Sequence, residues 1–340
     1  MRHVKRWLPT GLLLALLAFV ALRPPSGEEP VLRRDFPAMG TWISLSVHVD
    51  TPAQREAAER WLAETESSLH AFDKRWSPDG DGELGRYNAA VAADPAAPTP
   101  APLAALLALA EDFHQRSGGL FDPRLHHLVT LWGFDQESHF RTSPPDAEAI
   151  QQALDQSRDH RRALPWNLGA IAKGTAVDEA IDAARQAGLP NVLINAGGNL
   201  GAHGQHGERP WRIAIRHPRP SRDQRLLATM EPRDEAVITS GDYERYFEAD
   251  GKRFHHILDP ASGRPARGLQ SVTVVAASAA VADAASTALF VAGPLRWREL
   301  ARSLGLETVM VVDGEGQILA TPSAAERLHL AGDLSATVVP

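Results

Sequence analysis

Asn167-Leu168-Gly169-Ala170-Ile171-Ala172-Lys173-Gly174 opens the stretch that decides the fold of this 340-residue chain. Helical spacing of apolar residues follows over 170–187, and Gly188 ends the predicted helix. The apolar run 192–194 comes next and predicts a buried strand. A helix that leads directly into a buried strand predicts a mixed α+β domain.

Further strands and helices are predicted on both sides of this stretch. Alternation of apolar and polar residues over 41–49 predicts a half-buried strand, and helical spacing begins at Pro52. Apolar residues occupy most positions of 102–115, which predicts a largely buried helix. The other predicted elements are strands at 211–216, 226–230, 271–276 and 309–312 and a helix at 279–291.

Composition and charge exclude several classes of function. Hydrophobic residues make up 44% of the chain and charged residues 23%, as in an ordinary globular protein. The 35 basic and 42 acidic residues give a net charge of −7, so we expect no general nucleic-acid binding. Because the chain has no cysteine, it cannot form a disulfide, a zinc–thiolate site or an iron–sulfur cluster, and it has no thiol nucleophile.

The N-terminal residues 1–29 have the pattern of an export signal followed by a tether. Three basic residues precede an uncharged run over 7–22 that is rich in Leu and Ala. Cleavage as a signal peptide and retention as a membrane anchor both stay open, because the residues before the candidate cut are not uniformly small. A buried core helix is a third interpretation, which the basic flank does not favour. We therefore expect residues 30–340 to lie on the periplasmic side of a bacterial cell envelope.

Asp283 and Thr287 form the most informative chemical pair in the sequence. Their spacing of four places both on one face of the helix predicted at 279–291. A carboxylate and a hydroxyl make an oxygen-only set that suits Mg²⁺. The alternative interpretation is an Asp that complements the helix dipole and a Thr bonded back to its own helix.

Two glycine-containing stretches are candidate ligand sites. Helix N-terminal amides beside Lys173 can hold a phosphate, and Gly169 permits close approach of a ligand to the backbone. A plain helix entry with one exposed lysine is the alternative. Gly197 and Gly198 follow the predicted strand 192–194, where they permit ligand approach, a bulge or a simple turn.

A histidine and several aromatic residues complete the candidate chemistry. His256 stands at the end of a predicted strand, three residues before an Asp-Pro turn, and is a candidate general base. Most single histidines have no such role. Phe121, Trp132 and Phe134 lie near glycines and can either clamp a planar ring system or pack in the core.

The order and separation of these motifs resemble the ApbE family, the FAD:protein FMN transferases, over residues 35 to about 322. The matching stretches, in family order, are Met39-Gly40-Thr41, Leu131-Trp132-Gly133-Phe134, Gly169 with Ile171-Ala172-Lys173-Gly174 and Ala176-Val177-Asp178, Gly197-Gly198, Thr239-Ser240-Gly241-Asp242-Tyr243, His256-Ile257-Leu258-Asp259-Pro260 with Gly263 and Pro265, Ser271-Val272-Thr273-Val274, and Ala282-Asp283 with Thr287. The resemblance implies that residues 30–340 form an α+β, two-lobed ApbE-like (T-fold-like) domain of mixed sheet and helices. It also implies an FAD cleft between the lobes.

The resemblance implies a reaction and assigns residues to it. The activity is Mg²⁺-dependent transfer of FMN from FAD to a threonine or serine hydroxyl of a target protein, with release of AMP. Asp283, Thr287 and the backbone carbonyl of Ala170 would hold the metal, and His256 and Asp283 would be catalytic. The residues implied to contact FAD are Met39, Trp76, Leu120, Phe121, Asp122, Asn167, Lys173 and Leu258.

This chain departs from the family pattern at two positions, and two other functions stay open. Asn167 and Asn199 stand where the family usually has Asp. An FAD pyrophosphatase would use the same metal site with water as acceptor, and a non-catalytic periplasmic flavin-binding protein is the other alternative. None of the Ser-Gly pairs fits the acceptor motif of the family, so we expect the acceptor to be a separate exported or membrane-bound redox protein.

Overall fold

The computed structural model describes residues 30–135, 141–158, 165–222 and 224–340. The predicted signal or anchor at 1–29 lies outside these ranges, and Val31–Pro340 form one compact unit. The helices are α1 (Pro52–Arg75), α2 (Glu83–Ala93), α3 (Ala101–Arg116), α4 (His126–Trp132), α5 (Ala147–Arg158), α6 (Ala172–Gln186), α7 (Ala279–Ser303) and α8 (Pro322–Arg327). No helix within the described ranges is long and apolar enough to cross a membrane.

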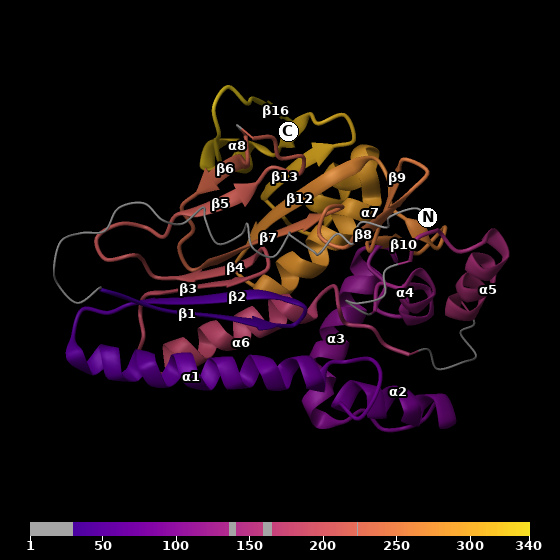
Figure 1. Ribbon diagram of the computed structural model, residues 1–340, viewed down its shortest axis with the longest axis horizontal. Helices are drawn as coiled ribbons and strands as arrows, with labels where there is room; N and C mark the ends of the chain where they lie inside the picture. The colour runs from indigo at the N-terminus through magenta and orange to yellow at the C-terminus, as the bar shows by residue number, and fades with distance from the viewer. Residues whose placement is uncertain (1–29, 136–140, 159–164, 223) are drawn as a thin grey trace, which may run out of the picture. The chain divides into compact units, whose positions relative to one another are not determined.

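A mixed sheet of nine strands organises the described part of the chain (Figure 1). Its strands are β1 (Val31–Ala38), β2 (Thr41–His48), β3 (Val192–Ala196), β4 (Asn199–His203), β7 (Glu235–Gly241), β12 (Leu269–Ala276), β13 (Thr308–Asp313), β14 (Ile318–Ala320) and β16 (Ala336–Val338). They pair in the order β1-β2-β3-β4-β7-β12-β13-β14-β16, antiparallel except for β14 with β16. The predicted α+β class is therefore confirmed, and the two-lobed cleft stays a prediction.

Three smaller sheets surround the large one. They are formed by β5 (Ile213–Arg216), β6 (Leu226–Met230) and β15 (His329–Leu330), by β8 (Tyr246–Ala249) and β9 (Lys252–His255), and by β10 (Leu258–Asp259) and β11 (Arg264–Pro265). β8 and β9 make a hairpin that leads directly to His256. The predicted strand 226–230 is confirmed, and the strand predicted from 211 begins at Ile213.

Both faces of the large sheet are buried, as the alternation within its strands shows. In β13, Val309 and Val311 belong to a core cluster with α1, α3, α6 and α7, whereas Met310 and Val312 pack with β5, β6 and α8 on the other face. Figure 1 shows α1 and α6 side by side below β1, β2 and β3. The helices that carry candidate site residues thus lie on one face of the sheet.

Two helix predictions need correction or refinement. The predicted burial of 102–115 is wrong, because α3 buries only one face and exposes Ala104, Ala105 and Ala108. Alanine is apolar but small, so it occupies exposed helical positions at little cost. The helix predicted at 279–291 continues to Ser303 as α7, with a kink at Gly293, where φ is +71°, and Pro294.

Candidate functional site

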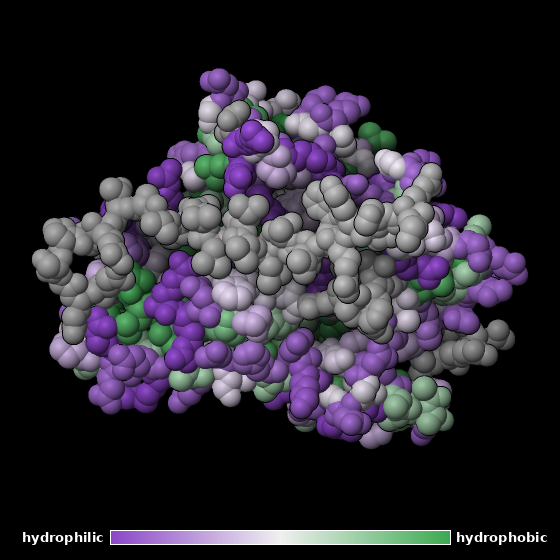
Figure 2. Space-filling model, in the orientation of Figure 1, coloured by the Kyte–Doolittle hydropathy of each residue, from purple (hydrophilic) through white to green (hydrophobic). Residues whose placement is uncertain are grey.

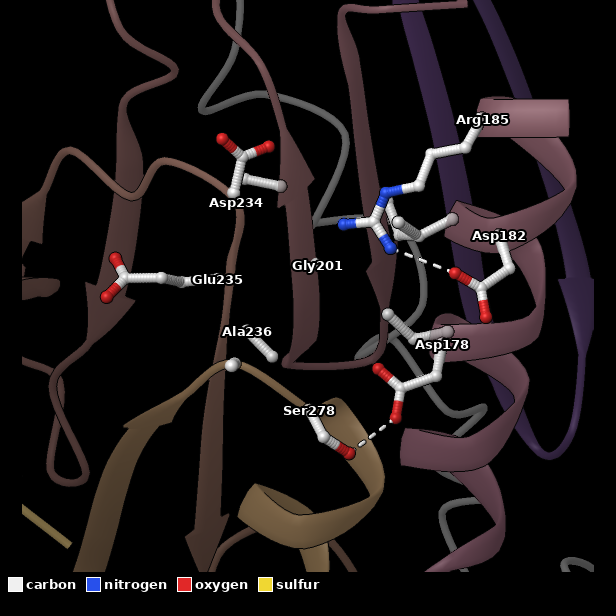
Figure 3. Close-up of a pocket in the computed structure, with 12 residues that line it drawn as sticks. Asp178, Asp182, Arg185, Gly201, Asp234, Glu235, Ala236 and Ser278 are labelled. Atoms are coloured by element: carbon white, nitrogen blue, oxygen red, sulfur yellow. Dashed lines mark hydrogen bonds and ion pairs between the residues drawn. The ribbon is translucent and has the colours of Figure 1, made fainter. Parts of the chain in front are cut away.

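Helices α6 and α7 cross so closely that their backbones touch. A Cβ atom added to Gly174 would lie 2.3 Å from the carbonyl oxygen of Ala279, so only glycine permits this crossing. Asp178 of α6 holds the start of α7, because its carboxylate accepts hydrogen bonds from the amides of Ala279 (2.7 Å) and Ala280 (3.0 Å) and the hydroxyl of Ser278 (2.7 Å). Figure 3 shows the contact between Asp178 and Ser278.

Asp283 of α7 in turn holds the start of α6 through a hydrogen bond. Its carboxylate is 4% exposed and accepts a hydrogen bond of 2.9 Å from the amide of Gly174. In a regular helix that amide would donate to the carbonyl of Ala170, four residues earlier. Because the amide donates to Asp283 instead, no hydrogen bond from the described residues reaches the carbonyl oxygen of Ala170.

The three implied metal ligands fit a hard divalent cation. Thr287 lies one turn after Asp283 on the same face of α7, is half-buried, and donates no hydrogen bond within the described ranges. A carboxylate, a free hydroxyl and a free carbonyl are the oxygen donors that Mg²⁺ prefers, with its other positions filled by water and phosphate. The described residues contain no group of three or more His, Asp or Glu side chains able to hold a metal. These residues therefore do not form a metal site made of protein side chains alone.

Asn167 joins the start of α6 to the loop that precedes α4. Its amide donates to the carbonyl of Pro123 over 2.7 Å, and its side-chain oxygen accepts from the amide of Gly169 over 3.0 Å. The second contact is an Asx turn, which shapes the entry to α6. The first contact places Asn167 beside Pro123 and so next to Asp122, whose carboxylate accepts from the amide of Arg124.

The stretch Leu120-Phe121-Asp122 is held from both sides. Phe121 is buried, donates its amide to the hydroxyl of Ser117 (3.0 Å), and offers its carbonyl to a ring nitrogen of His114 (3.0 Å). Its ring packs edge-on against Phe113 of α3. The Phe121 side chain is thus a core residue, while Leu120 and Asp122 beside it stay partly exposed.

Met39 and Trp76 are buried in the main core with unusual local features. Met39 has a φ of +52°, which is rare outside glycine, and forms a tight turn with Gly40 between β1 and β2. The indole N–H of Trp76 is buried and has no acceptor among the described residues. A buried donor without an acceptor is unusual in a native structure and accommodates an acceptor from a ligand or water.

The Gly197-Gly198 pair is the tight turn between β3 and β4, one of the alternatives that the sequence left open. Both residues have positive φ, and a Cβ on Gly197 would lie 2.0 Å from the hydroxyl of Thr41. The glycines therefore allow this turn to pack against the first residue of β2. Asn199, which follows them, is 3% exposed, and its side-chain nitrogen Nδ2 has no hydrogen-bond partner in the described ranges.

His256 is oriented by a single backbone carbonyl. The Arg245 carbonyl accepts both the amide of His256 (3.1 Å) and its ring Nδ1 (3.3 Å). Because a carbonyl only accepts, Nδ1 carries the proton and the lone pair is on Nε2. Burial, with Arg245, His255 and Lys173 nearby, lowers the pKa of His256 to about 3, so the ring is neutral at physiological pH.

His255 differs from its neighbour, although both rings are neutral. Its ring donates from Nε2 to the carbonyl of Ala266 (2.8 Å), accepts the amide of Ile257 at Nδ1, and packs edge-on against Phe290 of α7. Burial lowers the pKa of His255 as well. Both ring nitrogens are used, so His255 is a structural residue that docks the β8–β9 hairpin on the helix that carries Asp283 and Thr287.

The aromatic motif around Trp132 belongs to a separate core. Trp132 is fully buried, donates its indole N–H to the carbonyl of Gly263 (2.8 Å), and stacks on Phe134 and Phe254. Leu258 is buried in the same cluster. Of the two interpretations that the sequence offered for Trp132 and Phe134, core packing is the one the structure bears out.

The structure brings several of the assigned residues together. Lys173 at the start of α6 acts electrostatically on His256, and Asp283 bonds the residue next to Lys173. Asn167 lies beside the 120–122 stretch, and Met39 and Trp76 share the main core with α6 and α7. The sequence interpretation gave no role to Asp178 or to the Arg245 carbonyl, because their partners lie too far along the chain for any local pattern to indicate them.

Fold and site together define an α+β protein in which Lys173 and the oxygen atoms of Asp283 lie close to the start of α6. Two solved structures share the fold. The flavin transferase ApbE from Vibrio cholerae superposes with a TM-score of 0.75 at 28% identity, over 87% of this chain and 99% of that one. The ApbE protein of Thermotoga maritima gives 0.74 at 30% identity, over 86% and 97%.

Sequence comparison gives the same result. The FAD:protein FMN transferase of Rhodobacter capsulatus is 36% identical, over 94% of this chain, and this chain spans 63% of its length. The protein of that name from Klebsiella pneumoniae (strain 342) is 32% identical, over 87% of this chain and 89% of its own. A profile of the ApbE family matches residues 39–310. The chain belongs to the ApbE family, and the resemblance inferred from its motifs is confirmed.

Proposed function

We propose that this protein transfers FMN from FAD to a threonine or serine hydroxyl of another protein, releasing AMP, with Mg²⁺ as cofactor. The relatives are named FAD:protein FMN transferases, which supports flavin transfer from FAD to a protein. The observation that carries the finer proposal is the diverted amide of Gly174. It fixes Asp283 of α7 beside the start of α6 and leaves the Ala170 carbonyl without a hydrogen bond from the described residues.

The reaction needs positive charge at the FAD diphosphate, which an acidic protein must supply locally. Bound Mg²⁺ would neutralise the diphosphate oxygens and polarise the phosphorus that is attacked. Asp283, Thr287 and the Ala170 carbonyl would hold it, and the Lys173 ammonium would pair with the same diphosphate. The amides at the start of α6 add to this attraction for an anion.

We assign to His256 the removal of the proton from the attacking hydroxyl. Burial keeps its ring neutral by lowering the pKa of His256, and because Nδ1–H donates to the Arg245 carbonyl the lone pair is on Nε2, which has no partner among the described residues. As the hydroxyl oxygen bonds to the FMN phosphorus, its proton passes to Nε2, and the bond from that phosphorus to the bridging oxygen breaks. AMP leaves with the electron pair of that bond, so atoms and charge balance.

The test combines two readouts on the purified body, residues 30–340. FAD, Mg²⁺ and a threonine-containing acceptor peptide are incubated together, and AMP release and peptide mass are followed. Gain of one FMN per peptide that requires Mg²⁺ and is lost in Asp283→Asn supports the transferase. AMP without gain of peptide mass supports the pyrophosphatase, and FAD binding without AMP supports a binding protein.

We also propose that the protein acts outside the cytoplasm on a separate redox protein. The support is the basic and then uncharged pattern of residues 1–29 and the lack of an acceptor-like Ser-Gly motif in the chain. Fractionation of cells that express the full chain tests the first part. Covalent flavin on this chain itself, detected by mass, would contradict the second.

A further inference from the structure

A buried carboxylate, Asp242, connects the strand beside α7 to the hairpin that carries His256. Asp242 follows β7 directly, and its side chain is only 10% exposed. Two residues earlier, Ser240 exchanges a hydrogen bond of 2.8 Å with Ser286 of α7. The backbone of Asp242 is therefore anchored to the helix that presents Asp283 and Thr287.

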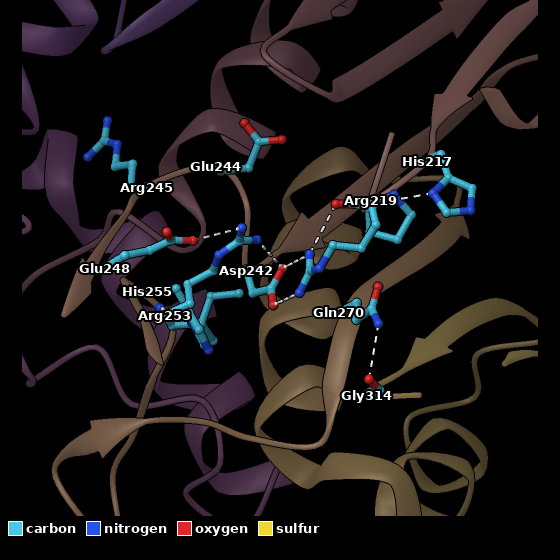
Figure 4. A network of polar contacts seen from close by, with 12 residues as sticks. His217, Arg219, Asp242, Glu244, Arg245, Glu248, Arg253, His255, Gln270 and Gly314 are labelled. Carbon is cyan, nitrogen blue, oxygen red and sulfur yellow. Dashed lines mark hydrogen bonds and ion pairs between the residues drawn. The ribbon is translucent and has the colours of Figure 1, made fainter. Parts of the chain in front are cut away.

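Two arginines from different segments meet at this carboxylate (Figure 4). Arg219, in the loop between β5 and β6, binds it through two parallel hydrogen bonds of 2.7 and 2.5 Å. Arg253 of β9 approaches it to 3.6 Å and also pairs with Glu248 of β8 at 3.3 Å. One carboxylate thus joins a loop, the end of a sheet strand and the hairpin.

Arg253 depends on Asp242 for its position. One of its terminal nitrogens is buried and has no hydrogen bond within the described ranges, so the ion pair with Asp242 is what balances its charge there. Its guanidinium also lies 4.0 Å from the ring centre of Tyr246, the first residue of β8. Arg253 therefore fixes both strands of the hairpin at the end that leads to the active histidine.

The position of the hairpin determines the position of the His256 ring. Tyr246 and His255 are the last pair of β8 and β9, and the next residues outward are Arg245 and His256. These two are joined by the pair of hydrogen bonds from His256 to the Arg245 carbonyl. Any shift of the hairpin base moves that carbonyl, and with it the direction of Nε2.

We propose that Asp242, clamped by Arg219 and Arg253, is a positioning residue that sets the orientation of His256 relative to the metal-ligand face of α7. This inference rests on the proposed role of His256 in the transfer. Loss of the carboxylate leaves two guanidinium groups facing each other at a partly buried site, so the base of the hairpin moves away from the loop that carries Arg219. A displacement of about 1 Å at a reacting group costs on the order of 100-fold in rate, so a smaller shift of the hairpin gives a loss of about 10-fold.

The test is a double-mutant cycle on the protein with FAD, Mg²⁺ and acceptor peptide. Asp242→Asn, His256→Ala and the double variant are compared for kcat at saturating FAD, for FAD binding and for Tm. Glu244→Gln is the matched control, because it removes one carboxylate two residues away that pairs with the exposed Arg216. We expect Asp242→Asn to lower kcat about 10-fold with FAD affinity within twofold, and Glu244→Gln to leave both unchanged.

The effect of Asp242→Asn in the His256→Ala protein shows whether the loss of kcat arises through His256. If Asp242 acts through His256, the substitution costs nothing further in the His256→Ala protein. Equal losses in both backgrounds, or an unchanged kcat in Asp242→Asn, overturn the proposal. A wild-type kcat in His256→Ala refutes instead the role of His256, which separates that failure from the first.

A milder substitution covers the case in which Asp242→Asn does not fold. Arg219→Lys keeps the charge but removes the planar fork that makes two hydrogen bonds. The Arg219 side chain is 41% exposed, so the change leaves the core intact. We expect Arg219→Lys to lower kcat by less than Asp242→Asn does, and only in the protein that retains His256. An unchanged kcat in Arg219→Lys would contradict the proposal.

Discussion

The α6–α7 pair and the β8–β9 hairpin bring groups to the same site, but different forces hold them. Between α6 and α7 the contacts are made by backbone, with Gly174 against Ala279 and the carboxylates of the half-buried Asp178 and the buried Asp283 on main-chain amides. The hairpin is held by side chains, namely the buried His255, Phe247 and Phe254 and the partly exposed Arg253. The implied metal ligands thus lie on helices joined through backbone contacts, whereas His256 follows a hairpin joined through side chains.

This difference suits the two tasks. A metal site needs fixed oxygen positions, and backbone contacts between rigid helices provide them. Under the proposed function, His256 must face a hydroxyl of a protein that arrives from solution, and the hairpin holds it in place beside α7. Outside the grey residues, Figure 2 shows mostly hydrophilic residues on the face in view. Among the described residues, the exposed large apolar side chains are Trp42, Tyr246, Leu295 and Val338.

A pocket beside α6 belongs to the α6–α7 region, and we do not interpret it as a second site. It has a volume of about 260 Å³ and is lined by acidic side chains of α6 and by Asp234 and Glu235 (Figure 3). Asp182 pairs with Arg185, and Asp234 with His203 and the amide of Gly204. Glu235 pairs with Arg327. Each carboxylate named here already has a partner and none is left to bind a ligand.

The largest expected effect lies in the α6–α7 region. Asp283→Asn keeps an oxygen to accept the Gly174 amide but removes the charge on the metal ligand. A bound metal contributes several kcal/mol to the transition state, so we expect transfer to fall by at least about 1000-fold. Titration of Mg²⁺ against AMP release measures it, and Tm should stay near that of the wild type. Transfer at the wild-type rate would remove Asp283 from the metal site.

The next largest effect lies on the hairpin. His256→Gln keeps a polar side chain but removes the proton acceptor, and we expect kcat to fall about 100-fold, within the usual range for a general base. FAD affinity, measured by flavin fluorescence, should not change, because in the proposed reaction the ring meets the acceptor hydroxyl and not FAD. A loss of FAD binding instead of kcat would make His256 a binding residue.

The pH dependence of the same variant follows from the lowered pKa. The unfolded chain takes up a proton on this ring below its ordinary pKa of 6.5, whereas the folded protein does so only near a pKa of about 3. Stability is therefore lost as the pH falls from 6.5 toward 3, and we expect His256→Gln to unfold at a lower pH than the wild type. Acid titration followed by circular dichroism measures it, and equal midpoints would contradict the assigned neutral ring.

Gly174→Ala tests the backbone contact itself. The added methyl meets the Ala279 carbonyl at 2.3 Å, so the helices must separate. We expect a loss of about 1–3 kcal/mol of stability from overpacking, although the same change gains about 1 kcal/mol in an open helix. Ala183→Gly, on the exposed side of α6, is the control and should leave transfer unchanged. An unchanged Tm and rate in Gly174→Ala would mean that the helices are not in contact as described.

The two regions also differ in how far the sequence predicts them. Helical periodicity placed α6 within two residues of its observed start, and family motifs pointed to Asp283 and Thr287. The sequence does not predict β7 as a strand, and its residues Thr239 and Ser240 stand out only as part of a family motif. The contacts that orient the site could not be predicted, since Asp178 binds residues 100 positions away and Arg253 reaches across a hairpin.

The smallest expected effect is at Asn167, where the family usually has Asp. The side-chain oxygen of Asn167 accepts the Gly169 amide, and a carboxylate oxygen can accept it equally well, so the Asx turn is kept. We expect Asn167→Asp to change the free energy of unfolding by no more than about 0.5 kcal/mol, and FAD binding to survive. The added charge lies near the proposed anion site, so any effect should appear in the transfer rate and not in the fold. A large loss of stability would show that the amide nitrogen, and not only the oxygen, holds the entry to α6.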